Sequence, residues 1–242
     1  PASSWGSPAC PAHGEEPFVG LPRDRVRPAP AFKICGLTRT VDAQVAAAAG
    51  ASYVGAILVP GSPRRVEVEV AAELASAVSI PLVVVTADLG PLEAAAAATA
   101  AGARGIQLHG AESPATVRAL REAGDWELWK AVRVRTPDDA LAAVDLFGLL
   151  VDLLLLDSWH PWKLGGTGAP FAWTSLASIR EGLQERLRLG VAGGITPENV
   201  EEAVAALRPD LVDVGSGVEE SPGVKDHRRI GELARRLANR ED

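Results

Sequence analysis

From residue 32 onward, short continuous apolar runs alternate with longer stretches rich in Ala, Leu and Glu. Continuous apolar runs are typical of strands buried on both faces, and apolar residues three or four positions apart are typical of the helices that cover them. We predict strands over residues 32–35, 53–58, 82–87, 105–108, 128–134, 153–156, 187–192 and 211–214. We predict helices near 40–49, 67–78, 91–101, 114–123, 137–146, 173–185, 197–206 and 225–238.

Start and stop signals agree with these helices. Thr38 precedes the first, Thr196-Pro197 places proline at the first position of the seventh, and Gly50 and Gly102 follow the ends of two others. The alanine-rich stretch 91–101 is short and is followed by glycine, so we interpret it as a helix with a small-residue face.

Strict alternation of strands and helices indicates an α/β fold, a single (β/α)8 TIM barrel. A doubly wound open sheet is the structural alternative. Residues 1–31 are rich in Pro, Ala and Gly and show no periodicity. We therefore expect a flexible, disordered extension over 1–31, dispensable for chemistry, and a catalytic barrel domain over 32–242.

Charge and cysteine content narrow the partners and the compartment. The 242 residues carry a net charge of -7, which argues against nucleic acid or an anionic membrane as a partner. No apolar run is long enough to span a bilayer, and no signal peptide is apparent, so a cytoplasmic location is expected. Cys10 and Cys35 are the only cysteines, and we expect no disulfide between them.

Two glycine-rich segments follow the seventh and eighth predicted strands. Backbone N-H groups at this position in such barrels commonly form a phosphate site, because glycine lets an anion approach the main chain. The alternative interpretation is a pair of tight turns. The candidate phosphate-binding residues are Gly193, Gly194, Ser216 and Gly217, with a short helical turn expected near Val218.

Cys35 and Asp157 are candidates for a general base and a general acid. Asp157 follows four leucines, and desolvation there would raise its pKa and keep it protonated. Cys35 needs a lowered pKa, and Lys33, two residues away on the same strand face, could supply the positive charge. The alternatives are a cysteine that fills the core and an aspartate that caps a turn.

Three more polar side chains lie at or beyond the ends of predicted strands. Arg64, in a rigid Ser-Pro turn, suits a forked clamp for a carboxylate, or is a solvated loop charge. Gln107 and His109 point the same way and either contact substrate or support another residue by hydrogen bonding.

No His or Cys pair has metal-ligand spacing, so no metal is expected. His160 lies in a long, glycine-containing loop that could act as a lid, or is a surface residue.

At these residues the chain resembles the phosphoribosylanthranilate isomerase family of tryptophan biosynthesis. The resemblance rests on KICGLT (33–38), PGSPR (60–64), QLHG (107–110), LDS (156–158) with GGTG (165–168), AGGITPENV (192–200), VDVGSGVE (212–219) and SPGVKD (221–226). It implies an Amadori rearrangement of N-(5-phosphoribosyl)anthranilate without metal or organic cofactor. Asp157 would protonate the ribose ring oxygen and Cys35 would remove the C2 proton. Arg64 would hold the anthranilate carboxylate, and Asp213 matches a substrate-contacting position.

Several positions depart from the family pattern. Thr86-Ala87-Asp88 stands where Phe-Val-Asn is expected, Ala172 replaces an aspartate, and Gly215 replaces a serine. Trp159, His160 and Trp162 could refill the aromatic pocket. Two alternatives therefore stay open: the same rearrangement on a modified anthranilate or related phosphoribosylamine, and a phosphate-binding barrel without catalysis. The expected partner is a small phosphorylated molecule, and the chain is expected to be a monomer or homodimer.

Overall fold

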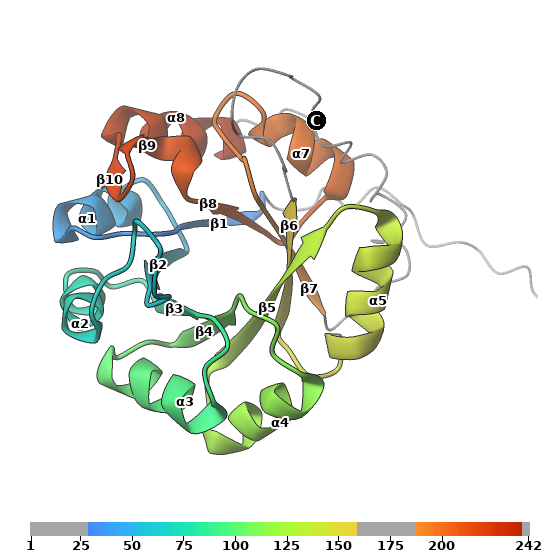
Figure 1. Ribbon diagram of the computed structural model, residues 1–242. Helices are drawn as coiled ribbons and strands as arrows, with labels where there is room; N and C mark the ends of the chain where they lie inside the picture. Colours follow the sequence, from blue (N-terminus) through green and yellow to red (C-terminus); the bar gives the residue numbers. More distant parts are fainter. Residues whose placement is uncertain (1–28, 159–186, 239–242) are drawn as a thin grey trace, which may run out of the picture.

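A barrel of strands surrounded by helices forms the body of the protein (Figure 1). The computed structural model describes residues 29–158 and 187–238. The strands are β1 (Ala31–Ile34), β2 (Tyr53–Ile57), β3 (Leu82–Thr86), β4 (Gly105–Leu108), β5 (Glu127–Val134), β6 (Leu153–Ser158), β7 (Arg188–Ala192) and β8 (Leu211–Val214). The helices are α1 (Thr40–Ala48), α2 (Val68–Ser76), α3 (Pro91–Ala100), α4 (Pro114–Ala123), α5 (Pro137–Phe147), α7 (Val200–Leu207) and α8 (His227–Ala238).

The eight barrel strands pair in chain order and the barrel is closed. Closure occurs between β1 and β8, which are parallel partners from Ala31 with Leu211 to Ile34 with Val214. The prediction of a (β/α)8 barrel is confirmed, and the open-sheet alternative is wrong. A closed parallel barrel brings the carboxyl ends of all its strands to one face, where function gathers in this fold.

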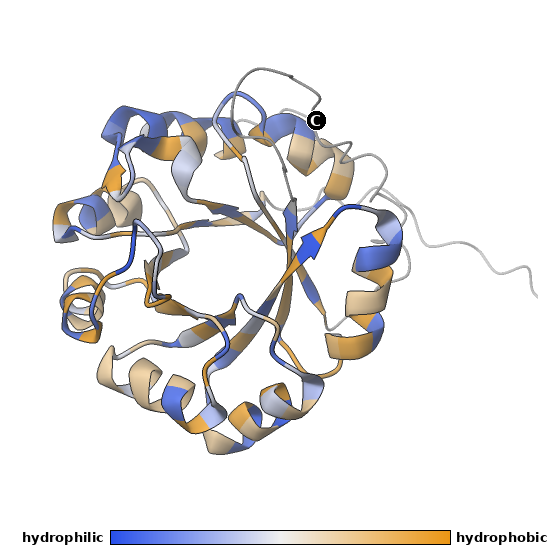
Figure 2. Ribbon diagram, viewed as in Figure 1, coloured by the Kyte–Doolittle hydropathy of each residue, from blue (hydrophilic) through white to orange (hydrophobic). Residues whose placement is uncertain are grey.

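Alternation along each strand divides the apolar residues into two cores. Val83, Trp129 and Leu155 belong to a cluster inside the barrel. Their strand neighbours, such as Val84 and Leu156, pack outward in a larger cluster with the helices. Figure 2 shows the corresponding helix pattern, with hydrophilic residues on the outer side of α8. Fully burying each large apolar side chain contributes about 1.5–3 kcal/mol, so these layers stabilise the barrel that carries the strand ends.

Two of the proposed helix signals are confirmed and two are not. Gly50 and Gly102 both have positive φ, and each donates its N-H to a carbonyl in the last helical turn, as glycine at that position does. Thr38 does not cap α1, because its hydroxyl donates to the carbonyl of Gly223 at 2.7 Å. Pro197 lies in a turn, and α7 begins at Val200.

Three features differ from the predicted elements. Strand β6 continues through Asp157, so this residue lies in the sheet rather than after it. A 3-10 turn, η2 (Ser216–Val218), follows β8, slightly earlier than expected. A short hairpin of β9 (Glu219–Ser221) and β10 (Val224–Lys225) follows that turn and was not predicted. The hairpin brings the charged residues Glu219 and Lys225 to the end of β1, where Lys225 Nζ donates to the Cys35 carbonyl.

Several sequence predictions fall outside the described residues. They concern the extension over 1–31, of which only the last residues are described, the helix at 173–185, and the loop with Trp159, His160, Trp162, Ala172 and the glycines 165–168. Among the helices of 29–158 and 187–238, none has the length and apolarity to cross a bilayer.

Candidate active site

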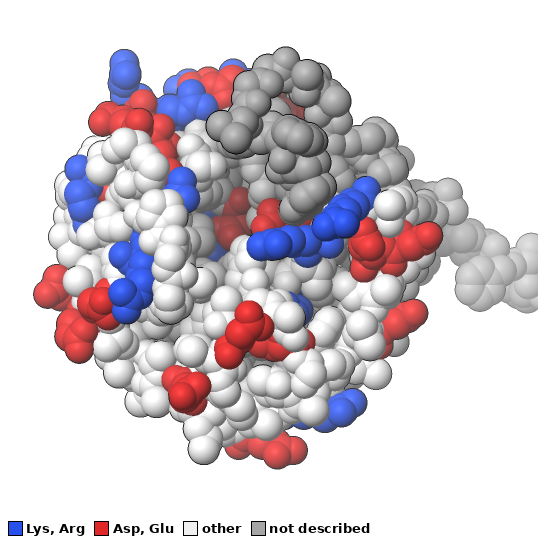
Figure 3. Space-filling view, in the orientation of Figure 1, with Lys and Arg blue, Asp and Glu red and all other residues white. Residues whose placement is uncertain are grey.

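A pocket of about 250 Å³ opens at the carboxyl ends of the barrel strands. Figure 3 shows the corresponding hollow, with acidic atoms inside it and basic atoms along its border. Its lining brings together most of the predicted site residues. The described residues that line it are Cys35, Ile57, Arg64, Val85, Gln107, His109, Asp157, Gly193, Gly194, Ile195, Asp213, Gly215 and Ser216.

A larger pocket of about 440 Å³ is lined by residues at the opposite ends of the strands, including Tyr53, Glu127 and Arg188. Four of its charged side chains form two ion pairs: Arg121 reaches Asp152 at 2.7 Å, and Arg188 lies 3.5 Å from Glu127. Groups at this face of a barrel serve stability rather than chemistry. The smaller pocket is therefore the candidate active site.

Lys33 lies inside the barrel beneath the pocket. Its side chain is fully buried, and its Nζ donates to Gln107 Oε1 at 2.6 Å and to Asp213 Oδ2 at 3.2 Å. The Nζ also lies 5.3 Å from the centre of the Trp129 ring. Burial opposes the charge on Lys33, but Asp213 and Cys35 outweigh it and raise the pKa of the ammonium. Lys33 is thus a buried cation that does not line the pocket.

Cys35 is 8% exposed and lies at the pocket wall. It forms no disulfide. Burial and the Asp213 carboxylate raise the pKa of the thiol, whereas Lys33 and Lys225 act to lower it. The positive charge expected from Lys33 is therefore present, but desolvation is the larger effect and the pKa of the thiol lies above its ordinary value.

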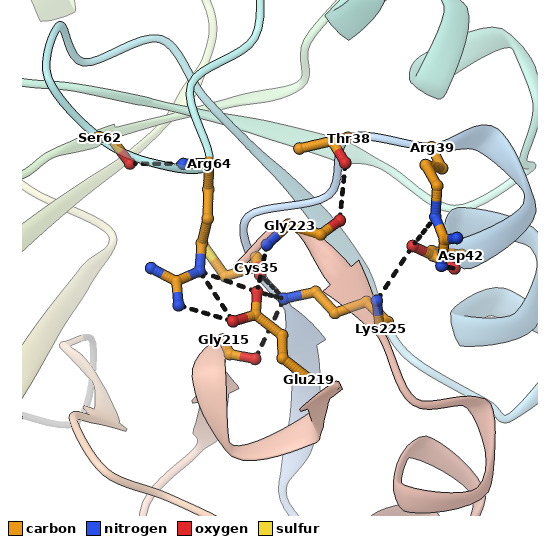
Figure 4. Close-up of polar contacts among 10 residues, drawn as sticks. All are labelled: Cys35, Thr38, Arg39, Asp42, Ser62, Arg64, Gly215, Glu219, Gly223 and Lys225. Atoms are coloured by element: carbon orange, nitrogen blue, oxygen red, sulfur yellow. Dashed lines mark hydrogen bonds and ion pairs between the residues drawn. The ribbon is translucent and has the colours of Figure 1, made fainter. Parts of the chain in front are cut away.

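Arg64 is held by an ion-pair cluster that sequence analysis missed (Figure 4). Its Nε donates to Glu219 Oε1 at 2.8 Å and its Nη2 to Oε2 at 2.6 Å. Glu219 also accepts from Lys225 Nζ at 2.8 Å. Lys225 further donates to the carbonyl of Cys35 at 2.6 Å, so the cluster joins the β9–β10 hairpin to the end of β1. The Arg64 guanidinium, which was predicted to hold a substrate carboxylate, is therefore already bonded to Glu219 along one edge.

His109 connects two other site residues. Its Nε2 lies 3.2 Å from Asp157 Oδ2, and its Nδ1 lies 3.0 Å from Gln107 Nε2. The Asp157 side chain is 23% exposed, so it faces the pocket and is less enclosed than its leucine-rich strand suggested. Gln107 is 1% exposed and bonds both Lys33 and His109. The side chain of Gln107 therefore lies at the pocket wall and joins Lys33 to His109 by hydrogen bonds.

The glycine segments after β7 and β8 lie next to each other. Gly193 and Gly194 have φ of 84° and 67°, the left-handed region that favours glycine. Gly217 does not line the pocket: a Cβ there would overlap the carbonyl of Ile195, so its role is close packing of the two segments. Arg229 of α8 anchors this contact by donating to Gly217 O at 2.9 Å.

Two of the family departures lie outside the pocket lining. Thr86 is 1% exposed and follows the strand alternation that sends Val84 outward, so no pocket aromatic is replaced there. Asp88 has a positive φ of 57°, and its Oδ1 accepts from the Ala111 N-H at 2.6 Å. Gly215 has only the Cys35 carbonyl near its would-be Cβ, at 3.7 Å, so a serine would fit. These changes preserve the described pocket.

Gly55 of β2 is a site residue that sequence analysis missed. A Cβ at this position would lie 2.6 Å from Lys33 Cε and 3.1 Å from Cys35 Sγ. Strand alternation, which aims residue 55 into the barrel, was the only available signal. Gly55 therefore makes room for both side chains.

Gly55→Ala should displace Lys33 and the Cys35 thiol. Contacts this short force a shift, and overpacking of a dense interior costs about 1–3 kcal/mol. We expect a lower melting temperature than that of the native protein. We also expect the rate of Cys35 alkylation to differ from the native rate. Differential scanning fluorimetry and alkylation kinetics check this, with Gly231→Ala as control, because a Cβ at Gly231 meets no atom within 4 Å and the φ of Gly231 is not positive. Native-like values for both quantities would contradict the close packing.

Among residues 29–158 and 187–238, no group of three or more His, Cys, Asp or Glu side chains is arranged to hold an ion. The carboxylates of Asp213 and Glu219 are engaged by lysines instead. The residues that line the pocket can transfer protons, recognise a carboxylate through Arg64 and bind an anion at the glycine segments.

Comparison with known proteins agrees with this arrangement. The family model for N-(5'-phosphoribosyl)anthranilate (PRA) isomerase matches residues 32–236. The enzyme of that name from Thermosynechococcus vestitus is 42% identical over 214 residues, 86% of this chain and 89% of the relative. The Paracoccus denitrificans enzyme is 44% identical over 203 residues, 82% of this chain and 92% of the relative.

Solved structures agree as well. Phosphoribosyl anthranilate isomerase from Thermotoga maritima superimposes with a TM-score of 0.78 at 31% identity, covering 86% of this chain and 98% of that one. A phosphoribosyl anthranilate isomerase in complex with reduced 1-(o-carboxyphenylamino)-1-deoxyribulose 5-phosphate gives a TM-score of 0.75 at 29% identity, covering 86% and 98%. The chain belongs to the N-(5'-phosphoribosyl)anthranilate isomerase family.

Proposed function

We propose that this protein catalyses the Amadori rearrangement of N-(5-phosphoribosyl)anthranilate to 1-(2-carboxyphenylamino)-1-deoxyribulose 5-phosphate, a step of tryptophan biosynthesis. One observation carries the proposal: Cys35, Asp157 and Arg64 line one pocket together with the glycine segments after β7 and β8. The first two supply a base and an acid, and the others supply recognition of a carboxylate and a phosphate. The sequence similarity of the family supports the same reaction.

Asp157 acts first, as general acid. Its carboxyl proton passes to the ribose ring oxygen while the bond between that oxygen and C1 breaks. The lone pair of the glycosidic nitrogen forms the C1=N bond, which gives an open-chain protonated Schiff base. The partly exposed Asp157 side chain is accessible to a ring oxygen in the pocket.

Cys35 acts second, as general base. Its thiolate takes the proton from C2, the electron pair of the C-H bond forms C1=C2, and the nitrogen becomes neutral. The resulting enolamine tautomerises to the ketose, so no proton, electron or cofactor is consumed overall. Lys33 and Lys225 favour the thiolate, although burial opposes it.

Substrate recognition uses the free part of Arg64 and the main chain. The bonds to Glu219 engage Nε and Nη2, which leaves Nη1 for the anthranilate carboxylate. The phosphate would bind at Gly193, Gly194 and Ser216, where glycine backbones permit close approach. Asp213 would contact the sugar, because its Oδ1 is buried at the pocket without a partner among the described residues.

Other expectations remain part of the proposal. The protein would work in the cytoplasm without a cofactor, as a monomer or homodimer, with residues 1–31 a dispensable extension. A structure of monomers generated from a dimeric phosphoribosylanthranilate isomerase of Thermotoga maritima superimposes with a TM-score of 0.74 at 30% identity, covering 87% of this chain and 99% of that one. That assembly is a property of the relative.

The experiment that tests the proposal compares specificity constants. We expect phosphoribosylanthranilate to give a higher kcat/KM than ring-substituted anthranilates or other phosphoribosylamines. Preference for a modified ring would favour the same rearrangement in another pathway. Tight binding of a reduced product analogue with no turnover of any substrate would favour a phosphate-binding barrel and overturn the proposal.

Asp213→Asn should lower the pKa of the Cys35 thiol. The Asp213 carboxylate raises that pKa through its negative charge, and asparagine removes the charge at nearly the same size. Thiolate absorbance, recorded as a difference against Cys35→Ser, should therefore appear at lower pH than in the native protein. The limb of the kcat/KM profile that follows titration of this thiol should move the same way. A midpoint that stays in place or rises would contradict the assigned electrostatics.

A further inference from the structure

A continuous chain of hydrogen bonds crosses the barrel from β8 to β6. Lys33 Nζ lies 3.2 Å from Asp213 Oδ2 and 2.6 Å from Gln107 Oε1. Gln107 Nε2 lies 3.0 Å from His109 Nδ1, and His109 Nε2 lies 3.2 Å from Asp157 Oδ2. The chain therefore ends on the candidate general acid, while Lys33, Gln107 and Asp213 are buried.

Lys33 sets the direction of the whole chain. An ammonium group has three donors and no acceptor, so the atom of Gln107 facing it must be the carbonyl oxygen. The amide nitrogen of Gln107 then faces His109 as a donor, and Nδ1 of the imidazole must accept. A neutral imidazole with an accepting Nδ1 carries its proton on Nε2, the atom that faces Asp157.

The reverse arrangement is excluded by donor-donor contacts. Turning the amide of Gln107 over would place its NH2 group 2.6 Å from the Lys33 ammonium, with both groups buried. Adding a second proton to His109 at Nδ1 would place N-H against N-H at 3.0 Å. Both alternatives leave buried donors unsatisfied, which is costly away from water.

We propose that Lys33 and Gln107 are positioning residues that hold His109 as a neutral imidazole with its proton on Nε2, aimed at Asp157. The tautomer stands on the geometry alone, and only its catalytic consequence rests on the proposed function. Gly55 makes the chain possible, because a Cβ there would lie 2.6 Å from Lys33 Cε.

The consequence concerns the ring-opening step. Oδ2 of Asp157 is occupied by the His109 N-H, so the proton that moves to the ribose oxygen leaves from Oδ1. The negative charge formed on the carboxyl group is met by a hydrogen bond that is already in place, and His109 keeps its own proton. Preorganised donors of this kind stabilise developing charge without reorganisation.

Charged and titratable groups around His109 come from several strands. Asp157 of β6 is its direct partner, and Arg133 of β5 is the register neighbour of Asp157. Cys35, Arg64 and Asp213 line the same pocket. Two of these groups are cationic and three are acidic, so the surrounding charge does not by itself determine which ring nitrogens of His109 carry a proton. The hydrogen-bond direction imposed by Lys33 determines it.

Nitrogen-15 NMR of histidine-labelled full-length protein tests the tautomer directly. The native protein near pH 7 should show His109 with a protonated Nε2 and an unprotonated Nδ1, assigned by loss of the signals in His109→Leu. In Gln107→Glu, a carboxylate oxygen faces Nδ1 and can accept, so His109 should become doubly protonated. His227, which bonds Asp42 at 2.8 Å elsewhere in the protein, is the internal control for folding.

The overturning results are equally specific. A proton on Nδ1, or a doubly protonated His109 in the native protein, would contradict the proposal. So would an unchanged His109 in a Gln107→Glu protein whose His227 signals are native-like. These readouts do not depend on turnover, so an inactive native protein with the expected tautomer would sink the isomerase proposal and leave this one standing.

A kinetic measurement separates positioning from substrate contact. His109→Leu removes a hydrogen bond to a charged group, so kcat should fall about ten- to hundredfold while KM changes little. A raised KM with native kcat would show instead that His109 binds substrate, and would overturn its assigned role.

Discussion

Replacing Cys35 by serine should lower kcat for phosphoribosylanthranilate by about 10²–10⁴-fold, the range spanned by loss of a positioned general base. A serine hydroxyl fits the same space but ionises far less readily than a thiol. The limb of the rate profile that follows titration of the Cys35 thiol should also disappear. Steady-state assays over a range of pH check both expectations.

Cys10→Ser provides the matched control, since Cys10 is the only other cysteine in the chain. It should leave kcat and KM at native values. A reduced product analogue should still bind Cys35→Ser, because Arg64 and the glycine segments are unchanged. A Cys35→Ser protein that retains more than about a tenth of native kcat would exclude the thiolate as the base.

Replacing Asp157 by asparagine should lower kcat by a similar factor, about 10²–10⁴-fold. Asparagine keeps a side-chain oxygen to accept from His109, but it has no carboxyl proton to give to the ribose ring oxygen. Ring opening should therefore become the slow step. Transient kinetics should show that the substrate disappears without early accumulation of a Schiff base.

Asp125→Asn is a suitable control for this variant, because Asp125 lines the pocket at the opposite end of the barrel. It should behave as native protein. If Asp157→Asn lost less than tenfold in kcat while Asp125→Asn was unaffected, another group would have to protonate the ring oxygen, and His109 would be the first to examine.

The fold was largely predictable because its signals are local. Buried strands of a parallel barrel are continuous apolar runs, and Gly50 and Gly102 terminate helices through a backbone geometry that glycine favours. The helix starts predicted from Thr38 and Pro197 were wrong. Proline also occurs in turns, and a threonine hydroxyl also forms long-range hydrogen bonds. Local chemistry cannot distinguish these uses, and tertiary contacts decide between them.

Most residues of the site could be predicted from the sequence, but what each of them does could be predicted less well. Strand ends meet at one face, so Cys35, His109 and Asp157 could be expected to converge. The pairing of Arg64 with Glu219 joins residues 155 positions apart and depends on a hairpin with no clear sequence signal. The direction in which the pKa of Cys35 shifts depends on burial and on several nearby charges. A sequence motif does not show which of these effects is larger.

The positions that depart from the family pattern show the same limit of prediction from sequence. From the sequence, Thr86 and Asp88 were candidates for pocket residues that remove an aromatic and add a charge. Alternation instead turns Thr86 toward the helices, and Asp88 accepts a backbone hydrogen bond from the next loop. Asp88 adopts a left-handed backbone that Asn and Asp both tolerate, so its local structural role survives the substitution.

The most direct test of the central claim is turnover of phosphoribosylanthranilate by the purified native protein, followed as loss of anthranilate fluorescence. We predict multiple turnovers without added metal or cofactor and formation of the carboxyphenylamino-deoxyribulose phosphate product. Folded native protein that binds the reduced product analogue but shows no turnover would contradict it.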